Sequence, residues 1–190
     1  LFGFEGGVDW APSEAIRFSL TAFDNKVRNA VANVTIGTNL RERRNVGAVH
    51  ARGLELGLEA KLGKVSLDGS LAWTDAKVEA TGLLDGKRPA QTPLIAASAT
   101  LAWVPKPGWR LAVTAKHTGA QFEDDLQTDL LPAATTLDAF MLVPLGGRFS
   151  LVLRGENLTD EAVVTRNQAG SIDLGAPRTL WAGLRISIGG

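Results

Sequence analysis

The chain has 190 residues and carries 20 lysine or arginine residues against 20 aspartate or glutamate residues, so its net charge is zero. This balance gives no bulk attraction toward nucleic acid, and the absence of cysteine excludes disulfide frameworks, thiolate metal sites and cysteine nucleophiles. Apolar residues make up 45% of the chain and charged residues 21%, which predicts a folded protein rather than a disordered one.

Apolar and polar residues alternate with a period of two along most of the chain. The apolar set occupies the even positions of residues 54–61 and the odd positions of 65–74 and 109–116. The alternation returns on the even positions of 179–188, with Trp181 as the exception. Since successive side chains of a strand point to opposite faces, each apolar set lies on one face. We count nine such strands and no segment with a helical period, which predicts an all-β, antiparallel fold.

Short and long connections follow one another along the chain. The short turns are 11–14, 62–64, 105–108 and 145–148. The longer, polar stretches are 35–45, 81–91, 122–133 and 165–177. An up-and-down sheet with tight turns at one end and long loops at the other is typical of transmembrane β-barrels of the bacterial outer membrane.

The aromatic residues form a second pattern. Four of them lie on apolar positions within a few residues of a short turn: Trp10, Trp103, Trp109 and Phe149. Trp73 follows the turn residue Lys64 by nine positions. At about 3.3 Å per residue and a strand tilt near 45°, it would lie roughly 20 Å farther across the membrane. These five residues therefore predict an aromatic girdle at the two membrane–water interfaces. The alternative is the core of a soluble β-sandwich, and the absence of tyrosine counts against the girdle.

The strand count indicates a piece of a longer protein. Nine strands cannot close a bacterial single-chain barrel, because such barrels have an even number of strands. An open edge in lipid would also leave backbone N–H and C=O groups unsatisfied. The chain begins at Leu1 in mid-pattern without a signal peptide, and no apolar run approaches the ~20 residues of a transmembrane helix. We therefore expect further strands before Leu1.

Several blocks of sequence resemble one family of barrels. They are Asn45–Glu55, Leu71–Ala76, Glu156–Glu161 and Ala176–Leu184, with Glu5–Trp10 and Phe18–Asn25 earlier in the chain. The run Asn157-Leu158-Thr159-Asp160 resembles the Asn-Leu-x-Asp segment of the penultimate strand in TonB-dependent receptors, and Pro177-Arg178 resembles the segment that opens their last strand. The resemblance extends over essentially the whole chain.

The resemblance implies a transmembrane barrel of roughly 22 strands with a plugged lumen. Residues 1–190 would form its last nine strands, and the plug domain would lie outside this chain. Such receptors lie in the bacterial outer membrane, bind a metal chelate such as a ferric siderophore and depend on TonB; outer-membrane lipid and the barrel-assembly machinery are further expected partners. The family usually ends on an aromatic residue, whereas this chain ends on Gly189-Gly190, which puts recognition of the terminus in doubt or indicates that the ending was altered.

Enzyme chemistry finds little support among the residues. His50 and His117 have no partner at metal-ligand spacing, and there is no H-x-x-x-H or G-x-S-x-G motif. We therefore predict no catalytic residue, metal site or cofactor. Asp124 and Asp125 are interpreted as a solvated loop. Four charged residues are interpreted as polar groups of the barrel lumen: Arg110, Lys116, Arg154 and Glu156.

The strongest candidate binding feature is a cluster of arginines in a predicted extracellular loop. Arg41, Arg43 and Arg44 could hold an anionic ferric chelate through charge-assisted hydrogen bonds. They could equally bridge lipopolysaccharide phosphates or keep the loop solvated.

Two other function classes remain open alongside active uptake. One is a passive outer-membrane porin or adhesin fragment, which upstream sequence without a plug and TonB box would indicate. The other is a soluble all-β binding module, which would fold alone without detergent in a cooperative transition. The transported ligand itself cannot be inferred from these residues.

Overall fold

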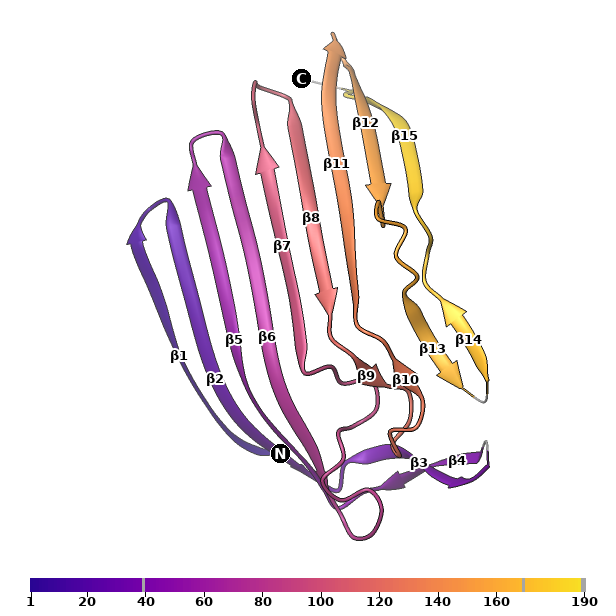
Figure 1. Ribbon diagram of the computed structural model, residues 1–190. Helices are drawn as coiled ribbons and strands as arrows, with labels where there is room; N and C mark the ends of the chain where they lie inside the picture. The colour runs from indigo at the N-terminus through magenta and orange to yellow at the C-terminus, as the bar shows by residue number, and fades with distance from the viewer. Residues whose placement is uncertain (39, 169, 189–190) are drawn as a thin grey trace.

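The computed structural model describes residues 1–38, 40–168 and 170–188 and contains one nine-stranded antiparallel sheet (Figure 1). Its strands, in spatial order, are β1 (Phe2–Ser13), β2 (Ile16–Arg28), β5 (Ala48–Leu62), β6 (Val65–Glu79), β7 (Ile95–Trp103), β8 (Arg110–Thr118), β11 (Ala134–Gly146), β12 (Phe149–Glu156) and β15 (Thr179–Ile186). Each of the nine strands pairs with the next of the nine along the chain, so the predicted all-β, up-and-down fold of nine strands is confirmed. The Gly189-Gly190 ending lies outside the described residues.

The connections separate by length, as predicted. All short turns lie at one end of the sheet and all long connections at the other (Figure 1). Three long connections fold into small hairpins of their own: β3 (Val31–Gly37) with β4 (Leu40–Asn45), β9 (Gln121–Phe122) with β10 (Leu130–Leu131), and β13 (Val164–Gln168) with β14 (Ser171–Leu174). We call the end with long connections the loop end and the other the turn end. No helix in the described part of the chain is long and apolar enough to cross a membrane.

The register decides which residues share a face of the sheet. From β2 through β6 the pairing runs without a bulge, so that Leu20 lies opposite Leu56 and Leu56 opposite Leu71. One face, the apolar face, carries such side chains, and the other, the polar face, carries residues such as Glu59 and Asp68, which lie opposite one another. Trp181 lies opposite Arg154 and therefore belongs to the polar face, in agreement with its exceptional position in the sequence pattern.

The sheet is a single curved layer with little core. Only seven apolar residues are buried among the described residues, and large side chains of the apolar face remain exposed, including Leu101 at 53% and Val113 at 50%. A soluble sandwich would cover that face with a second sheet. Strands β1 and β15 each pair on one side only within the described residues. The apolar face and the two edges therefore require partners other than water.

The Asn-Leu-x-Asp motif closes the turn that leaves β12. Asn157 is 5% exposed and adopts a left-handed conformation (φ 48°), which asparagine tolerates better than most residues. Its side-chain amide donates hydrogen bonds to the carbonyl oxygens of Glu161 (2.9 Å) and Ala176 (3.1 Å), and its oxygen accepts one from the Glu161 N–H (2.9 Å). Its backbone N–H donates to Asp138 of β11 (2.9 Å). Asn157 thus links β11, the turn after β12 and the segment before β15.

The motif continues this link at two further residues. Asp160 accepts a hydrogen bond from the Arg178 N–H at 2.9 Å, just before β15 begins. Leu158 packs over Gly155, where a Cβ would lie 2.6 Å from the Leu158 Cδ2 atom. Two of the sequence blocks that carried the family resemblance, Glu156–Glu161 and Ala176–Leu184, therefore contact each other and position β15 beside β12.

Replacing Asn157 with alanine is expected to destabilise this corner. The change removes the hydrogen bonds of the Asn157 side chain with backbone groups of Glu161 and Ala176, at a cost of about 0.5–1.5 kcal/mol for each bond. Denaturant unfolding of the full-length protein in detergent, followed by tryptophan fluorescence, measures the loss. Thr159→Val is the control, because the Thr159 hydroxyl makes only a 3.5 Å contact with Asn157. Equal stability of the two variants would contradict the proposed link.

Candidate functional site

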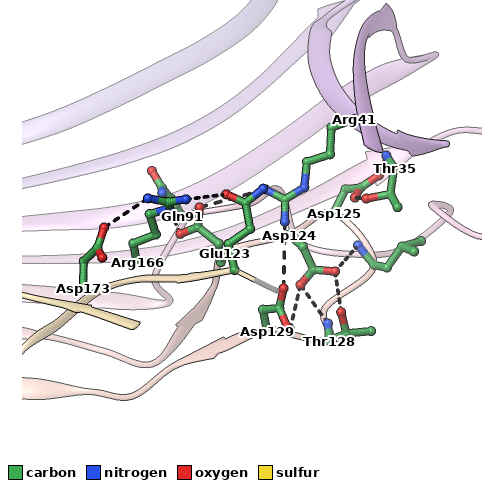
Figure 2. Close-up of polar contacts among 12 residues, drawn as sticks. Thr35, Arg41, Gln91, Glu123, Asp124, Asp125, Thr128, Asp129, Arg166 and Asp173 are labelled. Carbon is green, nitrogen blue, oxygen red and sulfur yellow. Dashed lines mark hydrogen bonds and ion pairs between the residues drawn. The ribbon is translucent and has the colours of Figure 1, made fainter. Parts of the chain in front are cut away.

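The long connections join into one polar network at the loop end of the sheet. The β3–β4 hairpin reaches across to the segment Glu123–Asp129, which connects β9 to β10 (Figure 2). The backbone N–H and the hydroxyl of Thr35 donate to the two carboxylate oxygens of Asp125, at 3.0 and 2.6 Å. Ninety positions separate these residues along the chain, so the contact fixes one loop against another.

Asp124 organises the segment that receives the hairpin. Its side chain is 3% exposed and accepts hydrogen bonds from the backbone N–H groups of Leu126, Thr128 and Asp129 and from the Thr128 hydroxyl, at 2.8–3.1 Å. Burial raises the pKa of Asp124, but these hydrogen bonds outweigh it and hold the pKa below the usual value of 3.8. An ionised Asp124 therefore shapes the loop, whereas the sequence had indicated a solvated pair of carboxylates.

Arg41 lies between two acidic residues of the same segment. Its guanidinium is 3.9 Å from Glu123 and 3.9 Å from Asp129, and its side chain is 22% exposed. Both distances exceed those of a direct charge-assisted hydrogen bond, so the attraction is mainly electrostatic. The acidic segment thus holds Arg41 beside it without saturating its donors.

The three predicted arginines do not share one surface. In the β3–β4 register, Arg41 and Arg43 lie on the same face of the hairpin, whereas Arg44 lies on the other. Arg44 pairs with Glu42, with Nε 2.8 Å from the carboxylate. Arg43 is exposed and has no ion pair within the part of the chain that the structure describes. The structure therefore brings together Arg41 and Arg43 and separates them from Arg44.

The other long connections attach to the same segment or to β10, which follows it. The Gln91 amide donates to Glu123 at 3.0 Å, the Lys87 ammonium donates to the Leu126 carbonyl at 2.9 Å, and the Asn167 amide donates to the Leu130 carbonyl at 3.1 Å. A cavity of about 240 Å³ lies within this network. Its lining includes Thr35, Arg41, Asp124, Thr128, Asp129 and Gln168. Sequence reasoning missed Glu123 and Asp129, although four acidic residues within seven positions were a visible signal.

The predicted girdle residues occupy three kinds of position. Trp10, Trp103 and Phe149 are exposed on the apolar face toward the turn end, where Trp10 stacks on Phe18 at 5.5 Å. Trp73 lies on the same face toward the loop end, opposite Leu54 and Ile95. Trp109 precedes β8 and is half-buried in the turn that its N–H closes onto Lys106.

The predicted lumen residues lie on the polar face. Lys116 donates to Asp138 at 2.8 Å, and Arg154 forms an ion pair with Glu156. Arg110 shares this face near the turn end. In the described ranges, no group of three or more His, Asp and Glu side chains is placed to hold a metal ion.

Comparison with known proteins gives one family model and many solved structures. The model for the TonB dependent receptor-like β-barrel matches residues 2–158. The siderophore receptor PiuA from Acinetobacter baumannii superposes with a TM-score of 0.81 at 18% identity, over 97% of this chain and 28% of that one. The unliganded ferric citrate transporter FecA gives 0.81 at 21%, over 96% and 30%. The ferric yersiniabactin uptake receptor FyuA from Yersinia pestis gives 0.80 at 16%, over 97% and 29%.

These comparisons define what the chain shares with its relatives. The chain spans less than a third of the length of each of these receptors. At such identities the superpositions establish a common fold. A comparison with curated protein sequences gave no match. The matched family comprises receptor barrels rather than enzymes, in agreement with the prediction that this chain has no catalytic function.

Acid should release the loop network through Asp124. Because its pKa lies below 3.8 in the folded loop, its stabilising effect is complete above that value and disappears as the pH falls through the lowered pKa. Hydrogen-exchange protection of the peptide 119–133, corrected for intrinsic rates, should therefore collapse only below about pH 3.8. In an Asp124→Asn variant the protection should already be low at neutral pH. Protection that persists in the variant at neutral pH would show that Asp124 does not organise the loop.

Proposed function

Because the chain belongs to the TonB dependent receptor-like β-barrel family, we propose that it forms part of an outer-membrane receptor for active uptake of a metal chelate. The single observation that carries this proposal is the family match over residues 2–158. The large apolar side chains exposed on one face of the sheet agree with it. A ferric siderophore is the proposed cargo class, since PiuA is a siderophore receptor and FyuA a ferric yersiniabactin uptake receptor. The proposed location is the bacterial outer membrane.

The membrane placement follows from the polarity of the two faces. On β5 the apolar face runs from Leu54 to Leu62, which spans roughly 20 Å of membrane at about 3.3 Å per residue and a tilt near 40°. We place the turn end in the periplasm and the loop end outside the cell. Trp10, Trp103, Trp109 and Phe149 would then lie at the periplasmic interface and Trp73 at the extracellular one.

The open edges support a larger closed barrel. Unpaired backbone groups of β1 and β15 would be costly in hydrocarbon, and further strands of a barrel would satisfy them. We propose that residues 1–190 are the C-terminal part of a barrel of roughly 22 strands, assembled by the barrel-assembly machinery. A plug domain and the contact with TonB would belong to other parts of the protein.

The β3–β4 hairpin, which carries the three predicted arginines, is the proposed point of chelate contact. Arg41, Arg43 and Arg44 would attract an anionic chelate to the extracellular mouth. Arg43 is the best placed of the three, since it is exposed and shares a hairpin face with Arg41. Glu123 and Asp129 interact with Arg41, so a bound chelate would have to displace them from its guanidinium.

Arginine on the apolar face should impair membrane assembly. Leu71→Arg and Leu184→Arg each place a charge toward lipid, at a cost of about 2–4 kcal/mol near the midplane. Heat-modifiable electrophoretic mobility and folding into lipid vesicles measure the effect in the full-length protein. Ser70→Arg is the matched control, because Ser70 is the neighbouring residue on the polar face. Normal insertion of both leucine variants would mean that the assigned faces are wrong.

Replacing Arg43 with glutamine should weaken chelate binding by about tenfold or more, the effect of losing a charge-assisted hydrogen bond. Binding and uptake of a radiolabelled ferric siderophore by iron-starved cells provide the measurement. Arg148→Gln, in a short turn at the opposite end, is the control and should bind normally. Uptake that continues without TonB would instead indicate a passive porin.

A further inference from the structure

The polarity of the sheet changes abruptly toward the loop end of β2, β5 and β6. Leu54 and Trp73 are the last members of the apolar stripe, and the next residues on the same face are Arg52 and Asp75. Because the register has no bulge here, these charged side chains point to the same side as the apolar stripe. The charges therefore lie on the outside of the proposed barrel, directly beyond its lipid-facing band.

This outer charged patch comprises eight residues from the three strands. They are Asp24, Lys26, Arg28, His50, Arg52, Asp75, Lys77 and Glu79. The opposite side of the same strands carries small or apolar residues, of which Ala76 and Val78 are buried. Toward the loop end, the outer face thus changes from apolar to charged and the inner face from polar to apolar. The change takes place within two residues along each strand. Such an inversion marks the edge of the hydrocarbon layer.

We propose that this patch binds the phosphate groups of an anionic lipid in the outer leaflet. Arg52 and Lys77 both contact the Asp75 carboxylate, at 3.2 and 3.6 Å, so that one acidic residue of the patch holds two cations side by side. Their side chains remain 59% and 55% exposed. A guanidinium has five N–H donors and an ammonium three, so both cations keep donors for a phosphate. The proposal rests on the membrane placement above but not on the identity of the transported chelate.

An apolar groove lies on the same face toward the turn end, separated from the patch by the pair Leu54 and Trp73. It has a volume of about 740 Å³ and is lined by Leu20, Leu56 and Leu71, with Gly69, Ala97 and Ala99 among its small residues. Arg52 follows Leu56 by four residues on β5, a distance of about 13 Å along the strand. A ligand that fills both features needs an apolar chain and an anionic head. This combination favours a phosphorylated lipid over a free phosphate ion.

The internal ion pairs define which cations are available. Lys26 pairs with Glu79, and His50 contacts Asp24 at 2.7 Å. Arg52 and Lys77 share a single acid and are the most exposed of these paired cations. They are therefore the residues to change, and the remaining pairs hold the strands in place around them.

The test uses the full-length protein in detergent with purified lipopolysaccharide as the probe. Binding is measured by the co-migrating phosphate and by the rise in unfolding temperature. The double variant Arg52→Gln/Lys77→Gln should bind about 30-fold more weakly, at roughly fivefold per cation near an anionic surface. The control Arg110→Gln/Arg185→Gln removes two cations from the polar face and should bind like the wild type. The charge-retaining Arg52→Lys variant should keep most of the binding.

Two results would overturn the proposal. One is equal lipopolysaccharide binding by the double variant and the wild type. The other is equal binding of dephosphorylated lipopolysaccharide by the wild type, which would assign the affinity to the acyl chains alone. Insertion of the wild type into vesicles is measured in parallel. Failure to insert would refute the membrane placement, whereas insertion with unchanged lipid binding in the variant would refute only the lipid site.

Discussion

The unbroken hydrogen-bond register across β2, β5 and β6 fixes the direction of every side chain in those strands. A shift of one residue would exchange the two faces, turning Leu56 inward and Glu55 outward together with all their neighbours. The apolar stripe, the polar face and the outer charged patch therefore all follow from this one strand register. Among the described residues the sheet has no second layer to enforce this register by packing, so the ladder of backbone hydrogen bonds and the surrounding solvent must enforce it.

The two ends of the sheet have different structural roles. At the turn end the chain reverses within a few residues, and aromatic side chains such as Trp103 gather near the reversals. At the loop end the long connections contact one another, and Asp124 is buried in the connection between β9 and β10. This connection is contacted by Thr35 and Arg41 of the β3–β4 hairpin and by Gln91 of the connection between β6 and β7. Hydrogen bonds and ion pairs thus hold the long connections of the loop end against one another.

Part of this arrangement could be predicted from the sequence alone. Period-two alternation predicted the nine strands and their faces because side-chain alternation is local to each strand. Trp181 broke the pattern, and the structure places it on the polar face, opposite Arg154. The arginine cluster was predicted less completely. Arg41, Arg43 and Arg44 are near one another in sequence, but a strand alternates its side chains, so Arg44 lies on the other face.

The sequence by itself determined the local structure: strand periodicity, the positions of turns, the balance of charge and the motifs shared with a receptor family. Only the tertiary structure decided which loops meet. The contact of Thr35 with Asp125 joins two separate connections, and the link from Asn157 to Ala176 joins the two ends of the connection between β12 and β15. The outer charged patch likewise required the register, since Arg52, Asp75 and Lys77 become neighbours only when β5 and β6 pair. Interactions between distant residues arise from strand pairing and loop packing, and no local pattern encodes them.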